Sequence, residues 1–215
     1  MKIIDTFLDL IFPRKCVGCQ QKIPGKQVLC PECQQQLIWR DNFESSSENH
    51  FSRAYAVYDF SPLIQKLIHD FKYNEMTLIG RFLAEQASAF ILAQNDFPKI
   101  DFIMPVPLHR VKKRFRGFNQ SEVLTRVIAK NCGFSHLPNA IQRKRFTQTQ
   151  TMLGRQERRQ NVLGAFKLKN PQRISAKTIL LVDDVFTTGA TVNSISNLLE
   201  NNGVSQIIVL TIARA

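Results

Sequence analysis

The stretch ILLVDDVFTTGAT, Ile179 to Thr191, joins an apolar run to a polar segment rich in threonine. Its four leading aliphatic residues are typical of a buried strand, and TVNSISNLLENNG, which continues from Thr191, has the apolar spacing of a helix. The loop of such a strand–loop–helix unit can point backbone N–H groups and hydroxyls at an anion, and the amino end of the helix adds favourable potential. We therefore predict a phosphate cradle formed by Thr187, Thr188, Gly189, Ala190 and Thr191.

Two aspartates, Asp183 and Asp184, stand between the apolar run and the predicted cradle. Carboxylates accept hydrogen bonds from vicinal hydroxyls, so the pair predicts a sugar phosphate as the ligand. Both side chains can face one ligand only if the strand has ended by Asp184, because successive strand residues point to opposite faces. The alternative is an acidic strand end that caps a helix. Neither a Walker sequence nor G-x-G-x-x-G occurs, so a nucleoside triphosphate or dinucleotide fingerprint is not supported.

Strand and helix patterns alternate along the chain. We expect strands at residues 53–60, 99–107, 178–184 and 204–214, and helices at residues 61–71, 76–93, 117–131 and 191–203. This alternation predicts an α/β fold with a parallel sheet covered on both faces. Ligands of such sheets bind beyond the carboxyl ends of the strands. Three polar loops fall there, at residues 105–119, 143–161 and 183–191.

The composition restricts the class of partner. The chain has 215 residues and a formal net charge of +12, which favours nucleic acid, phosphorylated metabolites or an anionic membrane surface, with a solvated basic surface as the alternative. No apolar run reaches the roughly 18 residues that span a bilayer. The opening MKIIDTFLDLIF carries two aspartates, which a secretory signal does not tolerate, so we expect a cytoplasmic protein. We expect that segment to pack on the body as an amphipathic helix, with a membrane-surface anchor as the alternative.

Two C-x-x-C pairs lie ten residues apart near the start of the chain. Thiolates at this spacing can converge on one tetrahedral zinc ion. We predict that its ligands are Cys16, Cys19, Cys30 and Cys33. Disulfides are disfavoured in a reducing compartment, and neither pair opens a helix after a strand as redox motifs do. Four thiolates leave no open position, so the ion is expected to be structural. A serine-rich linker around residues 41–50 then divides the chain into residues 1–45, the cysteine module, and residues 46–215.

Two of the polar loops concentrate cations beside aromatic rings. The first contains Arg110, Lys112, Lys113, Arg114, Phe115 and Arg116, and the second contains Arg143, Lys144, Arg145, Phe146, Arg155, Arg158 and Arg159. This mixture suits a single-stranded nucleic acid, whose phosphates attract the charge and whose bases stack on the rings. The loops could instead be simply solvated. They could also close over a pyrophosphate, which explains a few of the arginines but not the number of cations.

The stretch LLVDDVFTTGAT resembles the ribose-5-phosphate-binding motif of type I phosphoribosyltransferases. Together with MPVPLHR, RFRGFNQSE, the second basic loop and the cysteine pairs, it resembles the ComF/ComFC family of bacterial competence proteins over nearly the whole chain. The resemblance implies that Asp183 and Asp184 hold ribose hydroxyls and that the cradle holds the 5-phosphate. It places pyrophosphate at the turn formed by Pro105, Val106, Pro107 and Leu108. Many relatives carry further C-x-x-C pairs that this chain lacks, so a second metal is not expected.

The resemblance leaves two functions open. Relatives are implicated in handling single-stranded DNA during natural transformation, which agrees with the basic loops. We therefore expect a competence protein for DNA uptake that binds single-stranded DNA and phosphoribosyl pyrophosphate, with competence helicase or recombination proteins as further partners. The alternative is an active phosphoribosyltransferase on an unidentified acceptor, because fold alone does not establish transfer chemistry. Mg²⁺ would accompany the pyrophosphate. The sequence assigns no catalytic residue.

Overall fold

The computed structural model describes residues 14–40, 49–73, 76–144 and 164–215. Its centre is a five-stranded sheet in the order β1-β7-β6-β2-β3, in which each neighbouring pair is parallel. The strands are β1 (Arg53–Asp59), β2 (Phe102–Pro105), β3 (Ser135–His136), β6 (Thr178–Phe186) and β7 (Gln206–Arg214). The predicted parallel α/β fold is therefore confirmed.

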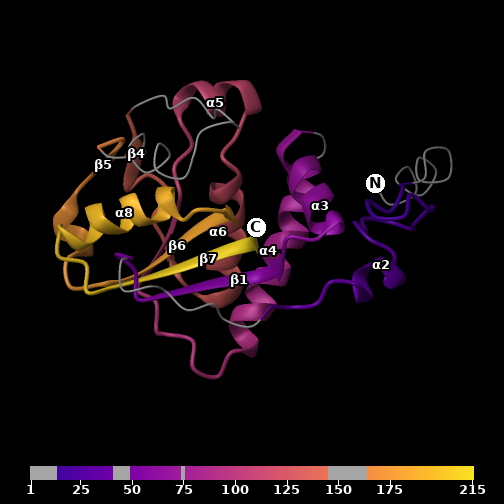
Figure 1. Ribbon diagram of the computed structural model, residues 1–215, viewed down its shortest axis with the longest axis horizontal. Coiled ribbons are helices and arrows are strands. Elements are labelled where there is room, and N and C mark those ends of the chain that lie inside the picture. Colours follow the sequence, from indigo (N-terminus) through magenta and orange to yellow (C-terminus); the bar gives the residue numbers. More distant parts are fainter. Residues whose placement is uncertain (1–13, 41–48, 74–75, 145–163) are drawn as a thin grey trace.

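Helices cover both faces of the sheet (Figure 1). The long helices are α3 (Pro62–Tyr73), α4 (Met76–Ala93), α6 (Gln120–Cys132) and α8 (Ala190–Glu200). Leu180 and Val182 of β6 pack in one core with α3, α4 and α6, whereas Ile179 and Leu181 pack in a second core with α8. Because both faces are buried, β6 is an unbroken apolar run rather than an alternating pattern.

The smaller elements lie around this body. They are α2 (Pro31–Gln35), α5 (Arg110–Arg116), the strands β4 (Ile141–Arg143) and β5 (Phe166–Leu168), and the 3-10 helix η1 (Pro171–Ile174). β4 and β5 pair in an antiparallel hairpin. Residues 16–33 of the cysteine module share the core of α3 and α4, so the module packs directly against the sheet domain.

The structure corrects two expectations. The segment 105–119 is not simply a loop, because it contains α5, whose ends are fixed by His109 and by Gly117 in the left-handed conformation at φ 81°. β6 does not end at Asp184, since it pairs with β7 as far as Phe186. Of the second basic loop, residues 145–161 lie outside the described part of the chain, while Arg143 ends β4 and Lys144 follows it.

Among the residues that the structure describes, no helix is both long enough and apolar enough to cross a membrane.

Candidate functional site

The loop between β6 and α8 adopts a turn that depends on one glycine. Gly189 precedes the first residue of α8 at φ 70°, a conformation that L side chains rarely adopt. A Cβ atom added to Gly189 would lie 2.6 Å from the Phe186 ring. The N–H of Ala190 points to the Thr188 hydroxyl at a long 3.5 Å. Thr188, Gly189, Ala190 and Thr191 are half-buried and Thr187 is exposed, so the predicted cradle lies at the surface beside a helix amino end.

The two aspartates have different hydrogen-bond and ion-pair partners. Asp183 Oδ1 accepts a hydrogen bond from the Ser121 hydroxyl at 3.0 Å and one from the Asp184 N–H at 2.9 Å. Asp184 Oδ2 lies 2.7 Å from Lys72 Nζ, and both side chains of this ion pair are less than a quarter exposed. Although β6 continues through Asp184, the partners of both carboxylates lie on α6 and α3, two helices that pack in the same core.

The two carboxyl groups therefore have different electrostatic surroundings. Burial, and then the negative charge of Asp184, raise the pKa of Asp183 to about 7. Its bonds to Ser121 and to the Asp184 N–H, together with Lys72, partly oppose this increase. Asp183 is thus a carboxyl group that changes charge near neutral pH at the start of the cradle.

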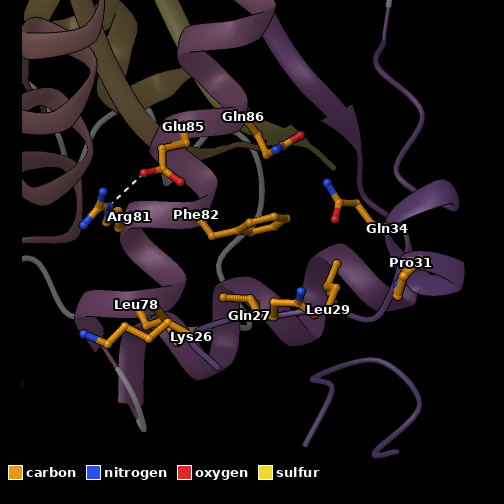
Figure 2. A pocket seen from close by; sticks show the side chains of 11 residues that line it. Lys26, Gln27, Leu29, Pro31, Gln34, Leu78, Arg81, Phe82, Glu85 and Gln86 are labelled. Atoms are coloured by element: carbon orange, nitrogen blue, oxygen red, sulfur yellow. Dashed lines mark hydrogen bonds and ion pairs between the residues drawn. The ribbon is translucent and has the colours of Figure 1, made fainter. Parts of the chain in front are cut away.

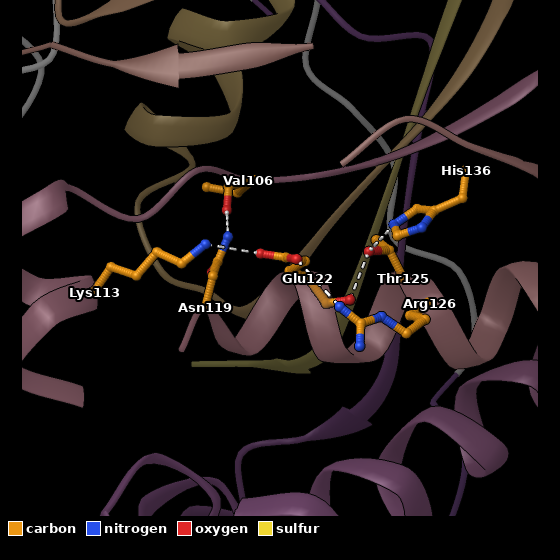
Figure 3. Close-up of polar contacts among 7 residues, drawn as sticks. All are labelled: Val106, Lys113, Asn119, Glu122, Thr125, Arg126 and His136. Carbon is orange, nitrogen blue, oxygen red and sulfur yellow. Dashed lines mark hydrogen bonds and ion pairs between the residues drawn. The ribbon is translucent and has the colours of Figure 1, made fainter. Parts of the chain in front are cut away.

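The turn from Pro105 to Leu108 is fixed beside the end of β6. The Val106 N–H donates to the Val182 carbonyl at 2.9 Å. The Val106 carbonyl accepts a bond from the buried Asn119 side chain at 3.0 Å (Figure 3). Pro105 and Val106 are buried, while Pro107 and Leu108 are half-buried. The structure therefore brings this turn to the same edge of the sheet as Asp183, through hydrogen bonds to β6 and α6.

α5 carries the first basic cluster on an exposed helix. None of its residues is buried, and the Phe115 side chain is 84% exposed. Its cations are Arg110, Lys112, Lys113, Arg114 and Arg116. An aromatic ring so far out of the core gains little from burial. Within the described part of the chain, the Phe115 ring therefore contributes little to packing.

Arg116 and Lys113 attach α5 to the body. Arg116 Nη2 donates to the Tyr73 hydroxyl at 3.2 Å, and its guanidinium lies 5.2 Å from the centre of the same ring. Lys113 Nζ lies 3.1 Å from Glu122 Oε2 on α6 (Figure 3). Tyr73 follows Lys72 in α3. The end of α3 therefore contacts both Asp184 of β6 and Arg116, the last residue of α5.

Other cations gather near the aspartates. Burial lowers the pKa of Arg143 on β4, and the charge of Asp183 opposes that shift. Burial also lowers the pKa of Lys112, and the positive charges of Arg143, Arg116 and Lys72 add to the effect. Part of each predicted basic loop is therefore brought to the edge of the sheet where Asp183 lies. Lys144 is exposed, whereas Arg145, Phe146, Arg155, Arg158 and Arg159 lie outside the described residues.

The sulfur atoms of Cys16, Cys19, Cys30 and Cys33 lie within 4.8 Å of one another. A tetrahedral zinc ion with Zn–S bonds of about 2.3 Å requires sulfur–sulfur distances of about 3.8 Å. Cys19 Sγ and Cys30 Sγ are 3.7 Å apart, and the N–H groups of Cys30 and Cys33 point to sulfur atoms of the cluster at 3.3 and 3.4 Å. The four thiols thus fit one zinc ion. A Cβ on Gly18 would lie 2.6 Å from Cys33 Sγ, which explains the glycine in the first pair.

The sequence did not single out Lys72, Tyr73, Ser121 or Glu122. Lys72 and Tyr73 end an otherwise amphipathic helix, and Ser121 and Glu122 lie in the first turn of another, where polar residues are ordinary. Their roles come from contacts between elements distant in sequence, which local patterns do not contain.

Fold and site together define a phosphoribosyl transferase-type domain preceded by a zinc-ribbon module. The phosphoribosyl transferase domain model matches residues 63–215, and the double zinc ribbon domain model matches residues 7–43. Competence protein F of Haemophilus influenzae is 31% identical over 210 residues, which cover 93% of this chain and 90% of that protein. The chain belongs to the ComF/ComFC family of competence proteins, with a phosphoribosyl transferase domain.

Other relatives carry related names. DNA utilization protein YhgH of Escherichia coli K12 is 28% identical, over 93% of this chain and 89% of that protein. Competence protein ComFC of Streptococcus pneumoniae is 26% identical, over 98% of this chain and 85% of that protein. The similarity thus extends over both the zinc-ribbon module and the sheet domain.

Proposed function

We propose that this protein binds and handles single-stranded DNA during natural transformation, on a scaffold that also binds phosphoribosyl pyrophosphate. The observation that carries the DNA-binding part is the exposed Phe115 ring within the cationic helix α5. Phosphates of a strand would lie along the cations, and a base would stack on the ring. The names of the relatives support a role in the use of DNA.

A merely solvated helix explains the cations of α5, whereas binding of a single strand also gives the exposed Phe115 ring a role. Closure over a pyrophosphate would use Arg143, which lies in the electrostatic field of Asp183, and Lys112, which lies in that of Arg143. Arg110, Arg114 and Phe115 are exposed and remain for a second polyanion. The basic residues therefore divide between the two ligands.

For the sugar phosphate, we propose that the loop from Thr187 to Thr191 holds the 5-phosphate and that Asp183 accepts a ribose hydroxyl. The turn from Pro105 to Leu108 would receive the pyrophosphate, and Mg²⁺ would bind chiefly to the pyrophosphate oxygens, as is usual for this ion. Asp184, paired with Lys72, would act mainly by fixing α3, and would reach the ligand only after that pair opens.

An active phosphoribosyltransferase is the second candidate. The observation that favours it is the position of Arg143, which the β4–β5 hairpin brings into the electrostatic field of Asp183. A hairpin beside the cradle is where an acceptor could be held. Release of pyrophosphate from phosphoribosyl pyrophosphate in the presence of DNA or free bases tests this candidate.

The remaining proposals concern setting and partners. We propose that the cysteine module holds one structural zinc ion, that residues 1–45 form the zinc-binding module and residues 46–215 the phosphoribosyltransferase-like domain, and that the protein acts in the cytoplasm with a competence helicase or recombination proteins. The experiment that tests the main function is a titration of fluorescent oligonucleotide with the full chain at low salt. Binding of single strands in preference to duplex is expected, because duplex bases are not available to stack.

A further inference from the structure

A groove with a volume of about 530 Å³ lies between the zinc-ribbon module and α4, and none of the described residues of the basic loops lines it. One wall comes from residues 26–34 of the module and the other from residues 78–86 of α4. In Figure 1 the module and α5 lie on opposite sides of α3. The groove is thus a second concave surface, separate from the cradle.

One half of the groove combines an aromatic ring with side-chain amides. Phe82 lies in the middle, with the side-chain amides of Gln34 and Gln86 on one side of its ring and Leu29 beneath (Figure 2). The Tyr58 hydroxyl donates to Gln86 Oε1 at 3.0 Å, which orients that amide. An amide both donates and accepts hydrogen bonds, as the edges of bases require, and an aromatic face stacks on any base.

The other half carries the cations. Lys26 and Arg81 lie on the side of Phe82 away from Gln34 (Figure 2), and both side chains are exposed. Glu85 is the carboxylate of the lining, and it is engaged by Arg81 Nε at 2.8 Å. The lining therefore has a net positive charge at one end and neutral polar groups around an aromatic ring at the other.

We propose that this groove binds one nucleotide unit of a single strand, with the base against Phe82 and its phosphate toward Lys26 and Arg81. The proposal rests on the proposed function, and it adds a second contact region beyond α5. A peptide would also fit the volume, but an aromatic ring flanked by amides at one end and cations at the other matches the base and phosphate of a nucleotide. A strand that reaches both regions would bind more tightly than one that reaches α5 alone, because the second contact becomes intramolecular.

The experiment uses the full zinc-containing chain and two lengths of single-stranded oligonucleotide, about 6 and about 30 nucleotides, chosen to reach one or both regions. The variants are Lys26→Glu, Gln34→Ala and Phe82→Leu. Leucine retains an apolar side chain where Phe82 packs partly against the core. Lys130→Glu is the control, since this exposed lysine on α6 gives the same change in net charge outside the groove lining.

We expect Phe82→Leu and Gln34→Ala to weaken binding of the long strand by about tenfold and about threefold, without changing its salt dependence. Lys26→Glu should weaken it and also flatten the salt dependence. The short strand and the Lys130→Glu control should be much less affected. Photo-crosslinking of an iodouracil-substituted long strand should label peptides containing residues 26–34 or 78–86.

Unchanged long-strand affinity in all three groove variants, with crosslinks elsewhere, would overturn the groove and leave DNA binding by α5 intact. Variants that bind DNA normally but fail in transformation would assign the groove to a protein partner, which also overturns the proposal. A wild-type chain that binds no single strand at low salt would remove both the groove and the proposed function.

Discussion

Lys72 Nζ lies 2.7 Å from Asp184 Oδ2, and this ion pair ties α3 to the carboxyl end of β6. The next residue of α3, Tyr73, holds Arg116 at the end of α5. A short series of contacts therefore connects the acidic end of β6 with the basic helix. Asp183, one residue earlier, is bound instead by Ser121 of α6.

Removing one partner of the Lys72–Asp184 pair should destabilise the fold. Both side chains are largely buried, so Lys72→Met leaves a carboxylate without its counter-charge, at a cost on the order of 2 kcal/mol. The double variant Lys72→Met, Asp184→Asn should recover much of that loss. Urea unfolding of the two single variants and the double variant measures the coupling. Strictly additive losses would show that the pair makes no energetic contribution.

The raised pKa of Asp183 predicts a pH-dependent stability difference between the wild type and Asp183→Asn. The folded protein keeps the proton up to a pH of about 7, whereas an unfolded aspartate loses it near pH 3.8. The unfolded state therefore binds fewer protons between these values, and the contribution of Asp183 to stability falls as pH rises through this window. Asparagine carries no charge and retains an acceptor for Ser121.

Chemical unfolding at several pH values between about 5 and 8 checks this expectation. The Asp183→Asn variant should become progressively more stable relative to wild type as pH rises, with the difference levelling off above the folded-state pKa. Ser121→Ala serves as the control that removes a hydrogen bond without removing the carboxyl group. A constant difference across the range would mean that Asp183 titrates normally.

The cradle predicts stabilisation by phosphoribosyl pyrophosphate with Mg²⁺. A ligand present at 100 times its Kd adds about 2.7 kcal/mol to the stability of the native state. Thr188→Val should reduce the increase in Tm, and Gly189→Ala should abolish it, because the new methyl group meets Phe186 and the backbone conformation is strained. Ribose 5-phosphate is the comparison ligand. An equal response in all three proteins would place the ligand elsewhere.

The cysteine cluster predicts about one zinc ion per chain. Cys30→Ser should lose the metal, and Gly18→Ala should weaken its retention because the added methyl group would lie 2.6 Å from Cys33 Sγ. Cys132→Ser is the control, since this cysteine lies outside the cluster. Elemental analysis and competition with a chelator provide the readout. Freshly purified wild-type protein without zinc would refute the assignment.

Helices and strands that impose a pattern on their own residues were predictable from the sequence. The apolar run of β6 predicts a buried strand, and the spacing of the apolar residues in α4 predicts a helix. Burial on one or both faces determines which positions are apolar. α5 was missed because it buries no residue and so has no apolar periodicity. The antiparallel β4–β5 hairpin was missed because its strands are three residues long and widely separated in sequence. The partners of Asp183 and Asp184, Ser121 and Lys72, lie on helices distant in sequence, so the local pattern could not predict these contacts.

The central claim, that α5 presents a stacking ring among cations to single-stranded DNA, is tested most directly by a salt titration of oligonucleotide binding. Phe115→Ala should weaken single-strand affinity by about 1–3 kcal/mol with little change in salt dependence, because a base loses its stacking partner. Val111→Ala, which removes another exposed apolar side chain of α5, is the matched control and should have a smaller effect. Arg110→Ala combined with Arg114→Ala should reduce the slope of log affinity against log salt by up to about 1.4. Wild-type protein that ignores single strands at low salt, or a Phe115→Ala variant that binds them as well as wild type does, would contradict the claim.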